Sequence, residues 1–592
     1  MTDTDDDLPP DTAPIRDAIA NAEEDLPRPL GPISKKPPSI IPLGQVCGVY
    51  YFISQAGEQR QFTARELVRL NIASLFGGNT AWLCVNFPVF NKKGNVIDGQ
   101  FNANNAAEWL MLQCGKRELF NPNTLIRRSG VWRHRDELIA HLGKNIWHQG
   151  KLQPAGVMIG GAIYPAINSA TSPDFASPST SHDAKILRAS FNAWNFTEPY
   201  DADLLLGYTG ASMLGAYPVW RVHALVTGER GSGKSALGEL IFSALGPQGS
   251  SMTDYSEAGI RQSLTNEARA LWLDEGESAS EEQATRMAKV IALMRQMSGG
   301  AGAKIARGSS GGTAISYTVT GSVLITAINP PGLQPQDRSR ILTVPLNMHS
   351  VDRSSTDIRL MCDEAAQMSA RLRARALIGY RRFGAAFEIF RSQLTSHGCD
   401  GRQADMFAAL LAGRSLLVDD EVPTGGAAMQ WVNKLEHRLR LIMFEDRDQS
   451  DAQSCLNHLL DAPCEAIRDG IKRTIGQIVA HGMRTVEQPE NEKLMPQGLR
   501  IVLERGDKNK RALFVANDHT ALKRVFHNTA WESKNWRASL LRLPGVAPSP
   551  VPISVGRKSR GVLIPASLLP LYESGDDYDP SPPDPAPPGV IQ

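Results

Sequence analysis

The sequence predicts an α/β fold built around a parallel sheet, and three segments support this. A glycine-rich run, GERGSGKS at residues 228–235, lies between the apolar stretch 222–226 and a helix-like segment. Two further apolar runs, 270–273 and 322–328, have the length and composition of buried strands. Each of them is followed directly by polar residues. Because the carboxyl ends of parallel strands share one edge of a sheet, we expect these polar side chains to gather there.

The glycine-rich run fits the pattern GxxxxGK[ST] in full, with a strand before it and a helix after it. In this pattern the glycines Gly228, Gly231 and Gly233 let backbone N–H groups surround phosphates, and Lys234 reaches the β- and γ-phosphate oxygens. Ser235 holds Mg²⁺. The run therefore predicts a site for ATP and Mg²⁺, and the alternative is a chance glycine loop.

Length and composition restrict the class of protein. A chain of 592 residues exceeds what a single hydrophobic core supports, so we expect several domains. The net charge is +1, so binding to nucleic acid would require local basic patches. The seven cysteines form no CxxC pair, and no apolar run has the length of a membrane span. The acidic N-terminus is unlike a signal peptide, so we expect a cytoplasmic protein without membrane contact.

Composition shifts divide the chain into seven predicted segments. They are a disordered acidic and Pro-rich tail (1–40), an N-terminal α+β domain (41–155), a connector (156–200), the parallel-sheet core (201–350), a helical domain (351–489), a winged-helix-like domain (490–573) and a disordered Pro-rich tail (574–592). In the first domain, residues 82–87 have the pattern of a strand. The aromatic and histidine residues of its second half are expected to be core and strand residues, not metal ligands: Trp132, His134, His141, Trp147 and His148.

The polar residues at the strand ends have the chemistry of nucleotide hydrolysis. Asp274 follows the strand 270–273 and is expected to hold Mg²⁺ with Ser235, while Glu275 polarises the attacking water. Asn329 follows the strand 322–328 and would orient that water and sense the γ-phosphate. The alternatives are a solvated acidic pair and an ordinary Asn-Pro turn.

Two arginines, Arg338 and Arg340, precede the strand-like segment 341–346. An arginine in this place is expected to reach the γ-phosphate of a neighbouring subunit and neutralise charge in the transition state. The sequence does not separate the two arginines. The alternative is a surface pair that bridges to Asp337.

Two basic segments are candidates for DNA contact. Lys304 and Arg307 lie in a glycine-rich segment (299–312) that is expected to be a projecting loop lining the pore of a ring. Arg557, Lys558 and Arg560 are expected at the tip of a hairpin that follows two short helices, 520–526 and 534–541. The alternatives are a solvent loop and a packing domain with a solvated tip.

The order of these motifs resembles the AAA+-type helicase module of phage and mobile-element replication proteins, the primase–helicase kind related to superfamily-3 helicases. The resemblance is close over residues 225–346. It implies an AAA+-like P-loop sheet with a helical lid, and Walker A roles for Lys234 and Ser235. It also implies Walker B roles for Asp274 and Glu275, the sensor role for Asn329, and the arginine finger for Arg338 or Arg340. Lys304 matches the DNA-contacting lysine of the family's B′ loop.

The resemblance implies an ATP-dependent DNA helicase that works as a homo-hexameric ring on single-stranded DNA. The sequence before residue 200 lacks the paired acidic motifs of a primase, so a separate polypeptide would prime. Two other functions stay open. One is an AAA+ ATPase that remodels or loads a protein partner of a replisome or defence complex. The other is an ATP-gated DNA-binding switch that hardly turns over.

Overall fold

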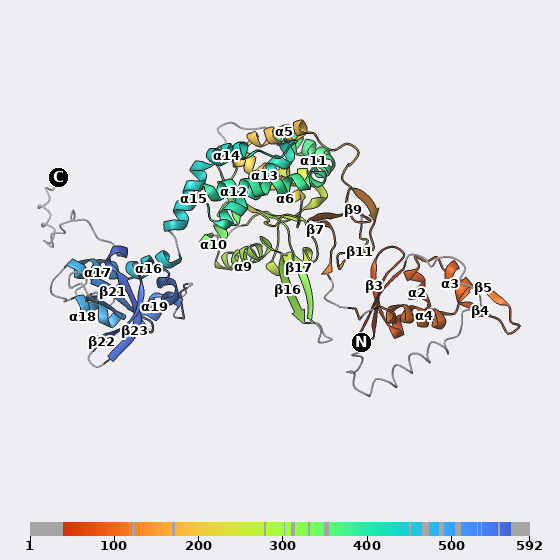
Figure 1. Ribbon diagram of the computed structural model, residues 1–592, viewed down its shortest axis with the longest axis horizontal. Coiled ribbons are helices and arrows are strands. Elements are labelled where there is room, and N and C mark those ends of the chain that lie inside the picture. The colour runs from red at the N-terminus through yellow and green to blue at the C-terminus, as the bar shows by residue number, and fades with distance from the viewer. Residues whose placement is uncertain are drawn as a thin grey trace, which may run out of the picture. The chain divides into compact units, whose positions relative to one another are not determined.

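The structure is a computed structural model, which describes residues 40–117, 119–120, 125–168, 172–276, 280–300, 302–308, 314–329, 332–348, 355–448, 451–464, 473–484, 490–503, 511–527, 529, 531–533, 535–554 and 557–569. The two predicted tails lie outside these residues, apart from Ile40. The chain forms two compact units that divide after Glu436 (Figure 1). Among the described helices, none has both the length and the apolar character that crossing a bilayer requires.

Unit 1 begins with an antiparallel sheet in the order β1-β2-β3, formed by β1 (Ile41–Val46), β2 (Val49–Ile53) and β3 (Gln59–Thr63). Short helices and a hairpin follow: η1 (Ala64–Glu66), α2 (Arg69–Leu75), α3 (Ala81–Asn86), β4 (Pro88–Phe90), β5 (Val96–Phe101) and α4 (Ala103–Gly115). The strand expected at 82–87 is wrong, because this segment is helix α3. Leu83 and Asn86 are buried one turn apart while Val85 is exposed, which is helical spacing.

Residues 125–164 form two small sheets. One has the order β10-β9-β8-β7 and the other β11-β12-β6. Their strands are β6 (Leu125–Ile126), β7 (Gly130–His134), β8 (Glu137–His141), β9 (Asn145–His148), β10 (Lys151–Pro154), β11 (Val157–Ile159) and β12 (Ala162–Tyr164). Gly130 bridges to Ala268 beside the central sheet, and a Cβ on Gly130 would lie 2.2 Å from the carbonyl oxygen of Ala268. Only glycine permits this approach.

The centre of unit 1 is a five-stranded parallel sheet with the order β14-β15-β18-β13-β19. Its strands are β13 (His223–Gly228), β14 (Gly249–Met252), β15 (Ala270–Leu273), β18 (Val323–Ala327) and β19 (Ile341–Leu346). The α/β class and the parallel sheet are thereby confirmed. Strand β18 is buried along its whole length, as expected for a strand covered on both faces.

Helices pack on this sheet and around it. Those between the strands are α7 (Lys234–Leu245), η3 (Gly246–Gln248), α8 (Glu257–Ser263), α9 (Glu281–Met297) and α10 (Pro335–Arg338). Helices before and after the sheet form a bundle: α5 (Ser181–Ser190), η2 (Phe191–Ala193), α6 (Asp201–Met213), α11 (Ser355–Ile378), α12 (Tyr380–Ser396), α13 (Gly401–Val418) and α14 (Gly425–Lys434). Helix α15 (Glu436–Asp448) begins at the last residue of unit 1 and otherwise belongs to unit 2. Every residue of α6 is buried, so this helix is the centre of the bundle.

The basic glycine-rich segment is an antiparallel hairpin and not the loop we expected. Lys304 and Arg307 lie on β16 (Ala303–Gly308), which pairs with β17 (Ala314–Val319). The pairing Lys304↔Thr318 and Arg307↔Ile315 gives both residues regular strand positions, because the glycines flank the strand. Figure 1 shows this hairpin extending from the core of unit 1, away from helices α11 to α14.

Unit 2 combines helices with an antiparallel sheet in the order β20-β21-β23-β22. Its elements are α16 (Asp451–Asp461), α17 (Ile475–Arg484), α18 (Glu490–Leu494), η4 (Met495–Gln497), β20 (Leu499–Leu503), β21 (Arg511–Ala516), α19 (Thr520–Val525), α20 (Asn535–Leu540), β22 (Ala547–Ser554), β23 (Arg557–Pro565) and η5 (Ala566–Leu568). The two short helices and the hairpin are confirmed. The winged-helix-like arrangement stays a prediction.

The basic residues of that hairpin lie in a paired strand, and Arg557 forms the last pair before the turn. Arg557, Lys558 and Arg560 belong to β23, and they pair across to β22 as far as Ser554↔Arg557. The turn is shorter than the sequence suggested, since strand pairing extends through residues that we assigned to the tip. Lys558 and Arg560 are exposed on this strand.

Candidate triphosphate-binding site

The glycine-rich loop (228–235) joins the end of β13 to the start of α7. Gly233 adopts a left-handed conformation with φ 86°, which glycine takes at little cost. Its carbonyl oxygen accepts a hydrogen bond of 2.8 Å from Nε1 of the buried Trp194. The loop conformation is therefore held by a residue of the predicted connector (156–200).

Trp194 is brought to the loop because the next residues extend the central sheet. Phe196 forms an antiparallel bridge with Leu346, the last residue of β19. The backbone N–H of Thr197 bonds the carbonyl of Pro345, and that of Asn347 bonds the carbonyl of Asn195. A buried indole seven residues before the start of α6 is a weak sequence signal, and no local pattern ties it to the loop.

Lys234 is buried within the loop. Its ammonium Nζ donates hydrogen bonds to the carbonyl oxygens of Gly228 (2.9 Å) and Glu229 (2.8 Å). The cation is thus held at the point where backbone N–H groups of the loop and of the first turn of α7 converge, and a helix N-terminus favours negative charge. A polyphosphate bound here would meet a positioned cation and a set of backbone donors.

The acidic residue after β15 contacts the loop across an intervening strand. Ser235 Oγ donates to Asp274 Oδ1 at 3.1 Å, and Thr326 Oγ1 of β18 donates to the same oxygen. Trp272 Nε1 donates to Thr326 Oγ1 at 3.1 Å. A hydroxyl and a carboxylate oxygen facing the loop form a donor set that suits Mg²⁺, which takes one or two protein oxygens and completes its shell with phosphate and water.

Glu275 follows Asp274 in a strained backbone conformation. It is exposed and has φ 58°, which a non-glycine residue seldom adopts. The next backbone N–H, that of Gly276, bonds the carbonyl of Thr326 at 2.9 Å, so the chain turns toward β18 immediately after the acidic pair. Such strain is concentrated at functional sites, where the surrounding structure holds it in place.

Asn329 lies at the same edge of the sheet as the loop. The register pairs Thr227 of β13 with Ala327 of β18, and Asn329 is the second residue after that pair. Its side chain is exposed. The expected gathering of positions 234, 274 and 329 at one edge therefore follows from the strand order, while the roles of these residues stay predictions.

The two arginines lie at the opposite edge of the sheet. Ile341, which follows Arg340, pairs with His223 at the start of β13, whereas the loop begins at the end of that strand. Six strand residues span about 20 Å, which is more than an arginine side chain covers. Arg338 and Arg340 therefore cannot serve the loop of their own chain.

Arg340 is engaged by groups of its own chain. The Arg340 guanidinium lies 5.8 Å from the centre of the Trp220 ring and bonds the carbonyl of Gln336. Burial and the positive charges of Arg402 and Arg295 lower the pKa of Arg340. Asp337 is buried and paired with Arg295, with Nε 2.8 Å from Oδ1.

We expect Thr326→Val to raise the Mg²⁺ concentration needed for nucleotide binding by about 10- to 100-fold, as loss of a hydrogen bond to a metal ligand typically does. The change removes the hydroxyl that bonds Asp274 and keeps the side-chain volume. A Mg²⁺ titration of fluorescent-nucleotide binding measures it. Thr326→Ser should restore the wild-type midpoint, and an unchanged midpoint in Thr326→Val would contradict the role of Thr326.

The chain matches no family model and no curated protein. Among solved structures it is similar to SCCmec type IV Cch, an active helicase, with 14% identity and a TM-score of 0.43 over 89% of this chain and 94% of that chain. It is also similar to the apo NrS-1 C terminal region (305–718), with 11% identity and a TM-score of 0.32 over 89% of this chain and 96% of that one. Because these similarities are distant, we base the functional proposal on side-chain geometry.

Proposed function

We propose that this protein is a Mg²⁺-dependent ATPase that translocates on DNA and unwinds it. Lys234 and the loop N–H groups bind the phosphates, and Ser235 and Asp274 hold Mg²⁺. Glu275 activates water, with Asn329 beside the γ-phosphate. The observation that carries this proposal is the 3.1 Å contact between Ser235 Oγ and Asp274 Oδ1. It brings an oxygen of the glycine-rich loop and an oxygen of the acidic pair close enough to bind the same Mg²⁺ ion.

The nucleic-acid part of the proposal is supported by the hairpin β16–β17. Lys304 and Arg307 lie three residues apart on one strand that extends from the ATPase core. A projecting basic hairpin that moves with the nucleotide cycle would grip phosphates of single-stranded DNA. Arg557, Lys558 and Arg560 of unit 2 would add contacts to the backbone.

ATP turnover measured with and without single-stranded DNA, beside a determination of mass in solution, tests this function. Stimulation by DNA and a ring-sized mass would support a translocase. ATP turnover that does not change when DNA is added would instead favour remodelling of a protein partner. Negligible turnover with intact nucleotide binding would favour an ATP-gated DNA-binding switch.

We further propose that Arg338 acts in trans, in a homo-hexameric ring. Arg340 is held by Trp220 and by the backbone of its own chain, which suits a structural role. Arg338→Ala should therefore lower turnover about a thousandfold or more, as loss of a trans arginine does in related chemistry. Arg340→Ala should act mainly on thermal stability.

Mixing separates action in trans from action in cis. Wild-type protein mixed with Arg338→Ala should lose more turnover than dilution explains, because each variant subunit disables its neighbour. Arg338→Ala mixed with Lys234→Ala should regain part of the turnover, because some interfaces then combine two intact halves. Activity that falls in proportion to dilution would contradict the trans assignment.

A further inference from the structure

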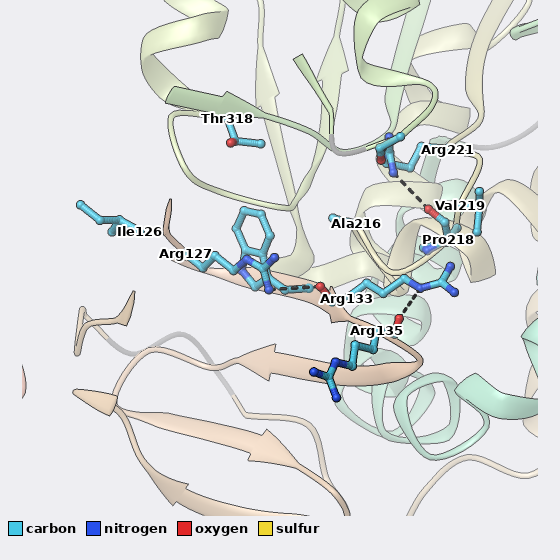
Figure 2. A pocket seen from close by; sticks show the side chains of 11 residues that line it. Ile126, Arg127, Arg133, Arg135, Ala216, Pro218, Val219, Arg221 and Thr318 are labelled. Atoms are coloured by element: carbon cyan, nitrogen blue, oxygen red, sulfur yellow. Dashed lines mark hydrogen bonds between the residues drawn. The ribbon is translucent and has the colours of Figure 1, made fainter. Parts of the chain in front are cut away.

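A pocket of about 420 Å³ lies at the amino edge of the central sheet, away from the glycine-rich loop. Its walls come from residues around β7, from the segment before β13, and from the two ends of the hairpin β16–β17 (Figure 2). The lining residues that carry the argument are Arg127, Arg133, Arg135, Arg221, Gly300 and Thr318. Four of them are arginines and none is acidic.

The arginines are largely without acidic partners among the described residues. Arg127 bonds the Tyr164 hydroxyl at 2.7 Å and the Arg133 carbonyl at 3.1 Å. Arg133 pairs with Asp136 at 3.1 Å, but that carboxylate is almost fully exposed, so solvent screens it. Positive charge is therefore concentrated in the pocket, and a bound anion would neutralise it.

Arg221 contributes a buried guanidinium. Its Nε, Nη1 and Nη2 donate to the carbonyl oxygens of Met297 (2.6 Å), Pro218 (3.1 Å) and Gly300 (2.9 Å). These bonds use three of its five N–H groups. Burial lowers the pKa of Arg221 to about 10, because it removes the charged guanidinium from water.

Arg135 occupies the turn between β7 and β8 in a left-handed conformation, with φ 53°. Gly or Asn would take this position with less strain. The turn is pinned because Arg133 Nε donates to the Arg135 carbonyl at 2.6 Å. Arg135 is thus an exposed arginine that lines the pocket, at a position where its residue type has no conformational advantage (Figure 2).

The pocket is continuous with the base of the basic hairpin. Thr318 lines the pocket and pairs with Lys304 in the hairpin, and Gly300 lies three residues before β16. Buried His223, whose pKa burial lowers to about 3, joins the same region by accepting from the Val323 N–H and contacting the Met294 carbonyl. A single strand of nucleic acid bound by the hairpin would therefore run past the mouth of the pocket.

From this arrangement we propose that the pocket binds a backbone phosphate of the single-stranded nucleic acid that the hairpin β16–β17 contacts. Arg135 and Arg127 meet the phosphate at the mouth, and Arg221 supplies positive charge from below. The inference rests on the proposed nucleic-acid function. The pocket adds a contact outside the hairpin, formed by residues 126–135. The nucleic-acid strand would then be bound at two points on one subunit, the hairpin and the pocket.

The test is the salt dependence of binding of a fluorescent oligothymidylate to the full chain without nucleotide. Arg135→Asn removes the charge and relieves the turn, so folding should be unharmed. It should weaken binding severalfold and lower the slope of log K against log salt by about 0.7, the value for one phosphate contact on a single strand. Arg135→Lys should keep most of the slope.

Arg128→Asn is the matched control, because Arg128 is exposed seven residues away and does not line the pocket. It should leave the slope unchanged. An unchanged slope in Arg135→Asn, beside normal wild-type binding, would overturn this inference and leave the proposed function standing. No binding by the wild type would overturn both. Stabilisation by inorganic phosphate that Arg135→Asn loses, with an unchanged DNA slope, would assign the pocket to a free anion and reject the strand contact.

Discussion

Lys234→Ala is expected to lower ATP turnover by about 100- to 1000-fold, the usual effect of losing one positioned group that stabilises transition-state charge. The ammonium is buried and held by two loop carbonyls, so it is already positioned within the loop. Steady-state phosphate release measures the effect, and the unfolding temperature checks that the fold is intact.

Arg230→Ala is the control for Lys234. It removes the same charge from an exposed position of the same loop and should change turnover only a few-fold. Wild-type turnover in Lys234→Ala would refute the assignment of the loop to phosphates. Equal losses in both variants would indicate that the net charge of the loop matters, and not a positioned ammonium.

Glu275→Gln is expected to bind ATP with Mg²⁺ normally and to hydrolyse it about 100- to 10,000-fold more slowly, the range for loss of a general base. Glu275 is exposed at the edge of the sheet, and its backbone is strained. Glutamine keeps the size and shape of the side chain and replaces only the carboxylate by an amide. Retention of labelled ATP on a gel-filtration column, beside single-turnover hydrolysis, separates binding from chemistry.

Glu282→Gln, which changes an exposed carboxylate in the first turn of α9, serves as the control for Glu275 and should behave as wild type. If Glu275→Gln also lost ATP binding, Glu275 would act in binding and not as the base. If it hydrolysed ATP at the normal rate, the base would be another group at this edge.

Much of the central sheet was predictable because each of its motif-bearing strands is a short apolar run with a polar end. The strands at 270–273 and 341–346 have the bounds that the sequence indicated. The segment 82–87 was wrong, since a six-residue apolar run fits a strand or one turn of helix equally well. Only its packing against the Phe76 and Trp109 rings decides.

The loop, the acidic pair and the amide can be recognised from local sequence, because a strand followed by polar residues is a pattern of neighbouring positions. Tertiary structure decided what surrounds them. Insertion of β18 between β13 and β15 makes Thr326 a partner of Asp274, and pairing of residue 196 with β19 brings Trp194 under the loop. The arginine pocket likewise joins segments up to 192 positions apart in sequence, from Ile126 to Thr318. Such contacts depend on strand order and register, which arise from burial across the whole core and leave no trace in local periodicity.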